Sequence, residues 1–434
     1  MPTKARLATF GVLLLVLAGG ACTGGPSKVV KLGVDLPLSG GAGRGGAATL
    51  NGVRFYVEQH PTLGGYSVVI ESRDDAVNGR SDPQRGSKNI QDLATDERVL
   101  AVVGPFDSSV ARATIPTANS AGLALISPSA SSRCLTKEPY LPAALSPAHA
   151  PITCAASGLP APKDLRPKGT NNFFRLATTD ELQGPAAADY AFQDLKLRRV
   201  AVLSDHEAYG QALAASFRSR FTRLGGLVVA TKDYDPNAIP DLSAFMKGAK
   251  ADGAQAVYIG GVTANHACVI RAQMTPTFPA GEATPFLGGD GIAQDPACIR
   301  DAGANAAGIY ATVPAANADS IASARSTIAD FKRRFDQPGE YGPYTIAAYD
   351  ATGILYAAIQ TAIQAAAGKA PTRDGVLAAL RSTTSYPGAL GTIGFDAEGD
   401  CTLRVVSVYK SAGPDPAAAW TWSKALDYSG ALPY

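Results

Sequence analysis

Apolar runs of one kind recur along the chain and constrain its fold more than any other feature. The runs VVKLGVDLPL, VLAVVGPF and LALISPSA are mostly apolar, and YSVVIESRD between the first two is a further predicted strand. Segments with helical spacing lie between these four strands. Strands that are apolar on both faces are typical of a parallel sheet covered by helices. The first part of the chain therefore predicts three consecutive strand–helix–strand units.

A second series of such units follows a break in the pattern. Residues 133–170 are rich in Pro, Ala and Ser and show no period, which indicates an ordered surface insert. Strands then recur at RRVAVLSDH, LVVATKDYD, AVYIGGV, PFLGGDG and GIYATVPA, followed by two long helical runs and the strands GTIGFDAEGD and RVVSVYK. A chain of 434 residues is also too long to fold around one ordinary hydrophobic core. We therefore predict an α/β protein with two doubly wound parallel-sheet lobes.

The strand ends predict where a ligand binds. In open parallel sheets, ligands bind outside the carboxyl ends of the strands. Two such surfaces facing each other would form a cleft, bordered here by the ends of VVGPF, ISPSA, VLSDH, YIGGV and FLGGDG.

The N-terminus has the features of an export signal. Lys4 and Arg6 precede an apolar stretch at residues 7–21, which is too short and too weakly flanked to be expected to span a membrane. Cys22 follows, as in the bacterial lipoprotein signal that this segment resembles. An ordinary cleaved signal with a chance Cys is the alternative. We favour a signal peptide at residues 1–21, lipidation at Cys22 and a tether at 22–28, because TGGPS is typical of a flexible linker.

The five other cysteines fit an exported protein, in which disulfides can form. Cys134 and Cys154 bracket the Pro-rich part of the insert and predict a local disulfide. Cys268 and Cys298 fall in predicted helices and would pair if those helices are neighbours. Cys401 is then left over. The spacing matches no CxxC metal pattern.

Several functional classes receive no support from the sequence. A net charge of +2 gives no indication of a nucleic-acid partner. The four histidines occur in no Ser/His/Asp or metal-ligand pattern, and no GxSxG or phosphate-binding loop is found. We therefore predict that the protein is not an enzyme and that it has no metal or cofactor.

Five segments together resemble a known family. KLGVDLPLSGGAG, VVGPFDSSVA, LISPSAS, VLSDHEAYGQ and FLGGDG occur in the order and at roughly the spacing of the leucine/isoleucine/valine-binding proteins. These are the type I periplasmic substrate-binding proteins of branched-chain amino acid ABC transporters. The resemblance covers roughly residues 29–410, apart from the insert.

This resemblance implies a fold in which two lobes close on an amino acid. It places lobe one at residues 29–174 and 317–388, and lobe two at residues 175–316 and 389–434, with the insert inside lobe one.

The resemblance also implies roles for five residues. Ser108 would bind the ligand carboxylate, Ser129 and Ser131 the ammonium through a carbonyl and a hydroxyl, and Ser131 could also donate its N–H to the carboxylate. Asp290 would face the ammonium from lobe two, and Tyr209 would lie over the ligand. Simpler interpretations exist: a helix cap at Ser108, a Ser-rich turn, an Asp–Gly turn at Asp290 and a packed Tyr at a helix start.

Two aromatic residues of the valine/leucine receptor have no aromatic counterpart here. They align with Gly45 and Val262, which puts branched-chain specificity in doubt. Arg44 and Thr263 are adjacent, and we include all four as candidate pocket-wall residues.

The sequence thus predicts an extracytoplasmic solute-binding lipoprotein that captures an amino acid or an amino-acid-like ligand for an ABC transporter permease. We expect a monomer on the outer side of the cytoplasmic membrane, held only by its lipid anchor and without a nucleic-acid partner. A ligand-sensing receptor module of the same fold is one alternative, and an exported α/β enzyme is another.

Overall fold

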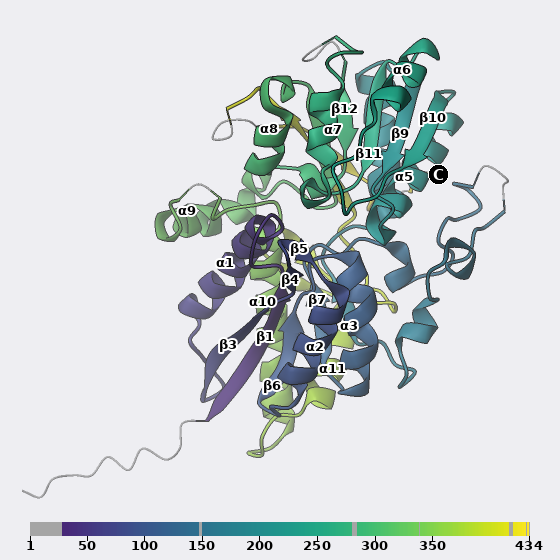
Figure 1. The fold of residues 1–434 in the computed structure, drawn as a ribbon. Coiled ribbons are helices and arrows are strands. Elements are labelled where there is room, and N and C mark those ends of the chain that lie inside the picture. Colours follow the sequence, from purple (N-terminus) through teal and green to yellow (C-terminus); the bar gives the residue numbers. More distant parts are fainter. Residues whose placement is uncertain are drawn as a thin grey trace, which may run out of the picture.

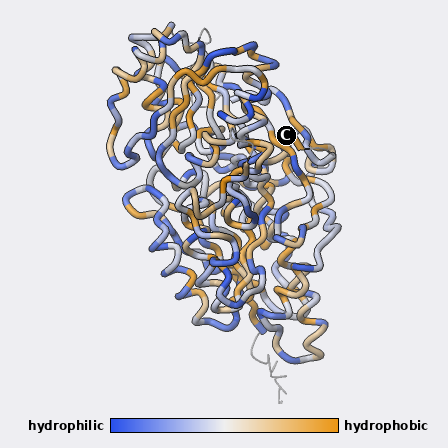
Figure 2. Tube along the Cα trace, turned by 90° about the vertical axis from the view of Figure 1, so that its right-hand side faces the viewer, coloured by the Kyte–Doolittle hydropathy of each residue, from blue (hydrophilic) through white to orange (hydrophobic). Residues whose placement is uncertain are grey.

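Two α/β lobes stacked along the long axis of the molecule make up the fold (Figure 1). The computed structural model describes residues 28–146, 150–279, 284–337, 339–415, 420–430 and 432–433. The predicted signal peptide and Cys22 lie outside these residues. Apolar segments gather in the interior of both lobes, and hydrophilic segments run along the outside (Figure 2).

The first sheet has six strands in the order β2-β3-β1-β6-β7-β8, all parallel except for the short β2. Helices α1, α10 and α11 pack with one face of this sheet, and α2 and α3 with the other. Helices α10 and α11 return to it from far along the chain. The elements are β1 (Val29–Leu36), β2 (Thr62–Leu63), β3 (Tyr66–Asp74), β6 (Val99–Val103), β7 (Ala124–Ser127), β8 (Phe173–Arg175), α1 (Gly43–Gln59), α2 (Pro83–Ala94), α3 (Ser108–Ser120), α10 (Thr345–Ala365) and α11 (Arg373–Arg381).

The second sheet has seven strands in the order β10-β9-β11-β12-β13-β16-β17. Its first five strands are parallel, and β16 and β17 are antiparallel. The strands are β9 (Arg199–Ser204), β10 (Leu227–Asp233), β11 (Ala256–Gly260), β12 (Phe286–Gly288), β13 (Ile309–Val313), β16 (Val405–Ser411) and β17 (Trp420–Asp427). The helices of this lobe are α4 (Asp180–Asp189), α5 (Ala208–Arg223), α6 (Ser243–Ala251), α7 (Ala267–Gln273) and α8 (Pro296–Ala302).

Smaller elements lie at the edges of the lobes. The hairpin of β4 (Ala76–Val77) and β5 (Arg80–Ser81) follows β3, and α9 (Arg325–Arg334) precedes α10. The pair β14 (Tyr386–Gly388) and β15 (Gly391–Ile393) follows α11.

The sequence patterns missed β8, α4, α11 and β17, and α4 shows why. All ten of its residues are buried, and Gly184 and Pro185, two poor helix formers, lie inside it. A helix that is buried on every side has no apolar stripe, so the helical period cannot be read from its sequence.

The disulfide predictions are confirmed. Cys134–Cys154 closes part of the insert, where the described residues form short 3₁₀ turns and one antiparallel bridge between Leu141 and Ile152. Cys268–Cys298 joins the neighbouring helices α7 and α8. Cys401 is the leftover cysteine and is buried.

A fully buried guanidinium joins the end of the first sheet to the C-terminal part of the chain. Arg175 ends β8 and is 0% exposed. Its Nε donates to Asp400 Oδ1 at 2.7 Å, and its Nη1 donates to the carbonyls of Ala130 and Ser132 at 3.1 and 2.7 Å. Lys137 pairs with the other Asp400 oxygen at 2.9 Å. Burial would raise the pKa of Asp400, but the charges of Arg175 and Lys137 outweigh it and hold the pKa below its usual value.

Asp400→Ala should lower the free energy of unfolding by about 3–5 kcal/mol, because it leaves a buried cation without its carboxylate. The exposed Asp319, paired with Lys332 at 2.8 Å, is the matched control, and Asp319→Ala should cost no more than about 1 kcal/mol. Urea denaturation followed by circular dichroism measures both. Equal, small losses in the two variants would contradict a structural role for the Arg175–Asp400 pair.

Two buried carboxyl groups lie at the carboxyl ends of β1 and β3. Asp35 and Asp75 are both 0% exposed. Neither Asp75 oxygen accepts a hydrogen bond from the described residues, and Asp35 accepts one from Asn89 at 2.8 Å. Burial raises the pKa of Asp75, and the neighbouring charge of Asp35 adds to the effect. Burial also raises the pKa of Asp35. The folded chain therefore retains a proton that the unfolded chain releases above about pH 4.

The free energy of unfolding should consequently fall as the pH rises from about 4 toward the folded-state pKa of Asp75. We expect Asp75→Asn to flatten this dependence and to stabilise the protein at pH 7 by about 1–3 kcal/mol, since each pKa unit corresponds to about 1.4 kcal/mol. Denaturation at several pH values between 5 and 8 measures this dependence. Asp330→Asn, at a carboxyl group that is 45% exposed, is the control. A destabilised Asp75→Asn variant that keeps the wild-type pH slope would refute the expectation.

Candidate functional site

A cavity of about 230 Å³ lies between the two lobes. Its lining comes from the segments that follow β1, β6 and β7 in one lobe and β9, β11 and β12 in the other, from the connection of β5 to α2, and from the segment before α10. Most of these segments follow the carboxyl ends of parallel strands. In the first sheet the chain goes from β1 to β3 on one side and then to β6 on the other, and in the second sheet it goes from β9 to β10 and then to β11 in the same way. Open α/β sheets bind ligands at such a switch point, and both switch points lie next to the cavity.

The structure brings all the sequence-predicted ligand residues to this one cavity. Its lining includes the five candidate ligand contacts and the four candidate wall residues. Which of them touch a ligand stays a prediction. The nine are Ser108, Ser129, Ser131, Tyr209, Asp290, Arg44, Gly45, Val262 and Thr263.

Serine hydroxyls join the two loops on the first lobe's side of the cavity. Ser127 Oγ and Ser129 Oγ donate to backbone carbonyls of the loop after β6, at 2.7 and 2.8 Å. Ser132 N–H donates to Ser108 Oγ at 3.1 Å. Ser131 Oγ is buried and interacts with the equally buried carboxyl group of Asp180, whose pKa burial raises and this contact lowers. The hydroxyls of Ser129 and Ser131 are therefore both engaged within the fold.

Backbone conformation and the end of a helix shape the same side. Gly104 follows β6 with φ of +122°, and a Cβ there would lie 2.1 Å from the carbonyl oxygen of Asp35, so only Gly fits. Helix α3 begins at Ser108, and the preceding Asp107 makes no side-chain cap. The N–H groups of a helix's first turn carry partial positive charge and favour an anion.

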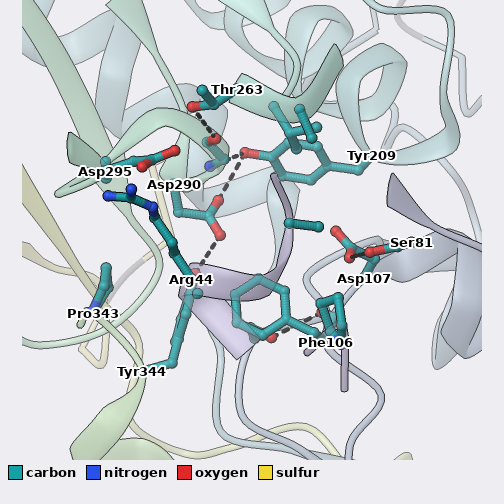
Figure 3. A pocket seen from close by; sticks show the side chains of 18 of the residues that line it. Arg44, Ser81, Phe106, Asp107, Tyr209, Thr263, Asp290, Asp295, Pro343 and Tyr344 are labelled. Atoms are coloured by element: carbon teal, nitrogen blue, oxygen red, sulfur yellow. Dashed lines mark hydrogen bonds between the residues drawn. The ribbon is translucent and has the colours of Figure 1, made fainter. Parts of the chain in front are cut away.

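Asp290 is the acidic centre on the second lobe's side. Its Oδ1 accepts hydrogen bonds from Tyr209 and Gln183, both at 2.8 Å. Its Oδ2 accepts one from Tyr344, and the contacts with Tyr209 and Tyr344 are drawn in Figure 3. Burial raises its pKa, and the three hydrogen bonds partly offset that shift. All three donors are neutral, and no cation pairs with Asp290 in the part of the chain that the structure describes.

Sequence reasoning missed two of these three donors. Tyr344 comes from the segment before α10, in the first lobe, so its hydrogen bond to Asp290 crosses the cavity. Gln183 lies in α4, the helix that the patterns did not reveal. Neither residue has a local motif that could have identified it, because each reaches Asp290 only through the fold.

An aromatic wall that sequence reasoning also missed lines the first lobe's side. The rings of Phe106 and Tyr344 meet edge to face, with centroids 5.5 Å apart. A Cβ on Gly45 would lie 3.2 Å from the Phe106 ring. Phe106 thus occupies the space beside Gly45, one of the two positions that align with an aromatic residue of the valine/leucine receptor. On the opposite wall, Thr263 Oγ1 donates to the Gly291 carbonyl at 3.3 Å.

Comparison with known proteins identifies the family. The model described as "Periplasmic binding protein" matches residues 29–411. The Leu/Ile/Val-binding protein BraC3 of Rhizobium johnstonii is 27% identical over 384 residues, covering 88% of this chain and 91% of that protein.

Solved structures share the fold. The leucine-binding protein LivK of Thermotoga maritima superimposes with a TM-score of 0.72 at 22% identity, covering 92% of this chain and 99% of that one. A solute-binding protein of an ABC transporter from Rhodopseudomonas palustris, in complex with p-hydroxybenzoic acid, gives a TM-score of 0.71 at 16% identity, covering 92% and 97%.

These findings confirm the predicted fold class and the predicted family. They also agree with the expectation that the chain is not an enzyme, because the family consists of solute-binding proteins. The match over residues 29–411, together with relatives aligned over most of their length, shows that this chain belongs to the periplasmic binding protein family.

Proposed function

We propose that this protein captures an amino acid or an amino-acid-like small ligand in the cavity between its lobes and presents it to an ABC transporter permease. The observation that carries the proposal is that Asp290 on one lobe faces, across the cavity, the start of helix α3 on the other, where Asp107 makes no side-chain cap and Ser131 lies nearby. A zwitterion carries one positive and one negative charge, so its binding site needs an anionic group and an anion-binding group that face the same cavity. The names of the relatives, which include leucine, isoleucine and valine, support the same ligand class.

In this proposal the ligand ammonium lies at Asp290, and its carboxylate at Ser108 and Ser131. The ammonium would supply the positive charge that Asp290 lacks. The N–H groups at the start of α3 would hold the carboxylate. Because the two groups belong to different lobes, a bound zwitterion would favour the closed arrangement, which a permease can recognise.

We further propose that the protein works outside the cytoplasmic membrane, tethered as a monomer through lipid on Cys22. Within the described residues, none of the helices combines the length and the apolarity that a membrane crossing requires. The proposed anchor rests on the apolar signal that precedes Cys22.

Asp290→Ala should weaken the binding of the best amino acid ligand roughly 30-fold or more, because truncating one partner of a desolvated charge pair costs about 2–5 kcal/mol. Ser108→Ala should cost less, since the helix N–H groups remain to hold the carboxylate. Calorimetric titration of both variants and the wild type measures this, with thermal unfolding as the check on folding. The ligand is not a zwitterion held in this way if its amine-free analogue binds the wild type equally well and Asp290→Ala binds normally.

Mass spectrometry tests the anchor separately. Protein extracted from membranes of the native host should begin at Cys22 and carry the added mass of a diacylglyceryl group. The matched variant Cys22→Ser should lose that mass and be released from the membrane fraction. Wild-type protein that is cut at another residue and carries no lipid would show the anchor to be wrong.

A further inference from the structure

The cavity between the lobes carries more negative charge than one ligand ammonium requires. Five carboxyl groups line it against two guanidinium groups, those of Arg44 and Arg80. The carboxyl groups are those of Asp107, Asp205, Glu207, Asp290 and Asp295.

Two of these carboxyl groups have a clear place in the fold. Asp205 is fully buried and accepts a hydrogen bond from Asn265 Nδ2 at 2.8 Å. Asp295 caps helix α8 by accepting from the Ala297 N–H at 2.7 Å. Arg80 donates to Asn237 of the other lobe at 2.8 Å and so contributes to a contact between the lobes.

Glu207 precedes α5 without capping it, and no side-chain hydrogen bond among the described residues holds it. Asp107 is held by Ser81, but its place in the fold is otherwise unexplained. It occupies the N-cap position of α3 without capping that helix. Its Oδ2 accepts a hydrogen bond from Ser81, and its Oδ1 receives none from the described residues, nor does any of their cations pair with it. Burial raises its pKa to about 6, and the charges of Asp290 and Glu207 contribute. Asp107 is thus a half-buried acid that faces the cavity with one oxygen unused.

The position of Asp107 differs from that of Asp290. In Figure 3, Asp107 and Ser81 lie on one side of the cavity and Asp290 on the other. A ligand whose ammonium is bound by Asp290 would therefore extend its side chain past the Phe106 wall toward Asp107. An apolar side chain there would remove water from a carboxyl group without replacing its hydrogen bonds, which is costly. A cationic side chain would supply both the charge and the donors.

We propose that Asp107 is a specificity-determining residue that binds a second cationic group of the ligand, so that the preferred ligands are α-amino acids with a cationic side chain. Ser81 orients the carboxylate through its hydrogen bond to Oδ2. This inference rests on the proposed function, because Asp290 and the start of α3 still hold the amino acid backbone.

Matched ligand pairs test the proposal by calorimetric titration of the full mature chain. L-lysine and L-norleucine differ only in the terminal ammonium, and L-ornithine and L-norvaline differ in the same way. The wild type should bind the cationic member of at least one pair tenfold or more tighter. Asp107→Asn should remove that preference by weakening the cationic ligand tenfold or more, while norleucine or norvaline binding changes less than threefold.

A control variant separates a local contact from the general charge of the cavity. Asp295→Asn removes the same charge from the same lining but at a carboxylate that already caps a helix, so the preference for the cationic ligand should persist. A similar loss in Asp295→Asn and Asp107→Asn would overturn the assignment to Asp107. Thermal unfolding of each variant confirms that it folds, and Ser81→Ala, which leaves every charge in place, should weaken lysine or ornithine binding several-fold.

The outcomes distinguish this inference from the function on which it rests. Tighter binding of norleucine or leucine than of lysine and ornithine would overturn the role of Asp107 and leave the amino acid site standing. Cadaverine, which is lysine without its carboxylate, tests the proposed carboxylate site. If cadaverine bound as tightly as lysine, the Asp107 contact would stand and the proposed carboxylate site would fall. Failure of every amino acid to bind would overturn both.

Discussion

The site depends on a buried cation, Arg175, that does not itself line the cavity. Arg175 hydrogen-bonds the carbonyls of Ala130 and Ser132, on either side of Ser131, while Asp400 neutralises its charge. Two carbonyls of the loop after β7 are thus held in place, and the hydroxyl of Ser131 between them interacts with Asp180. A buried ion pair is weak evidence for added stability, but it specifies one arrangement of the groups around it. Here that arrangement fixes the backbone of the loop that borders the cavity.

On the cavity side of the same loop, hydrogen bonds of serine hydroxyl groups hold the backbone in place. Ser127 and Ser129 bond the loop after β6, and Ser132 bonds Ser108 at the start of α3. Both loops are therefore fixed relative to the helix terminus before a ligand arrives. Groups that are already ordered cost little conformational entropy on binding, so more of the interaction free energy appears as affinity. This accounts for the repeated serines at the end of β7, since small hydroxyl side chains can form hydrogen bonds between neighbouring loops where space is limited.

The sequence predicted the layered fold well because the buried parallel strands are visible as continuous apolar runs. β3 was expected at its observed bounds, and β1, β9 and β10 were expected within a few residues of theirs. The patterns failed where burial erases periodicity, as in α4. The site divides in a similar way: residues in strand-end motifs, such as Ser131 and Asp290, were identified from the sequence. Tyr344 and Gln183 were not, because their contact with Asp290 spans 54 and 107 positions of the chain.

The hydrogen bonds of Asp290 link ligand binding to the arrangement of the lobes. A carboxylate offers about four lone-pair sites, and three are occupied here by Tyr209, Gln183 and Tyr344. One site remains, and the negative charge is not balanced by a cation of the described chain. A ligand ammonium would fill the last site and supply the missing charge. Because Tyr344 reaches across from the other lobe, the same carboxylate is best satisfied only when the lobes are close together. Ligand binding and closure would then stabilise one another through a single side chain, which requires no separate signal between the lobes.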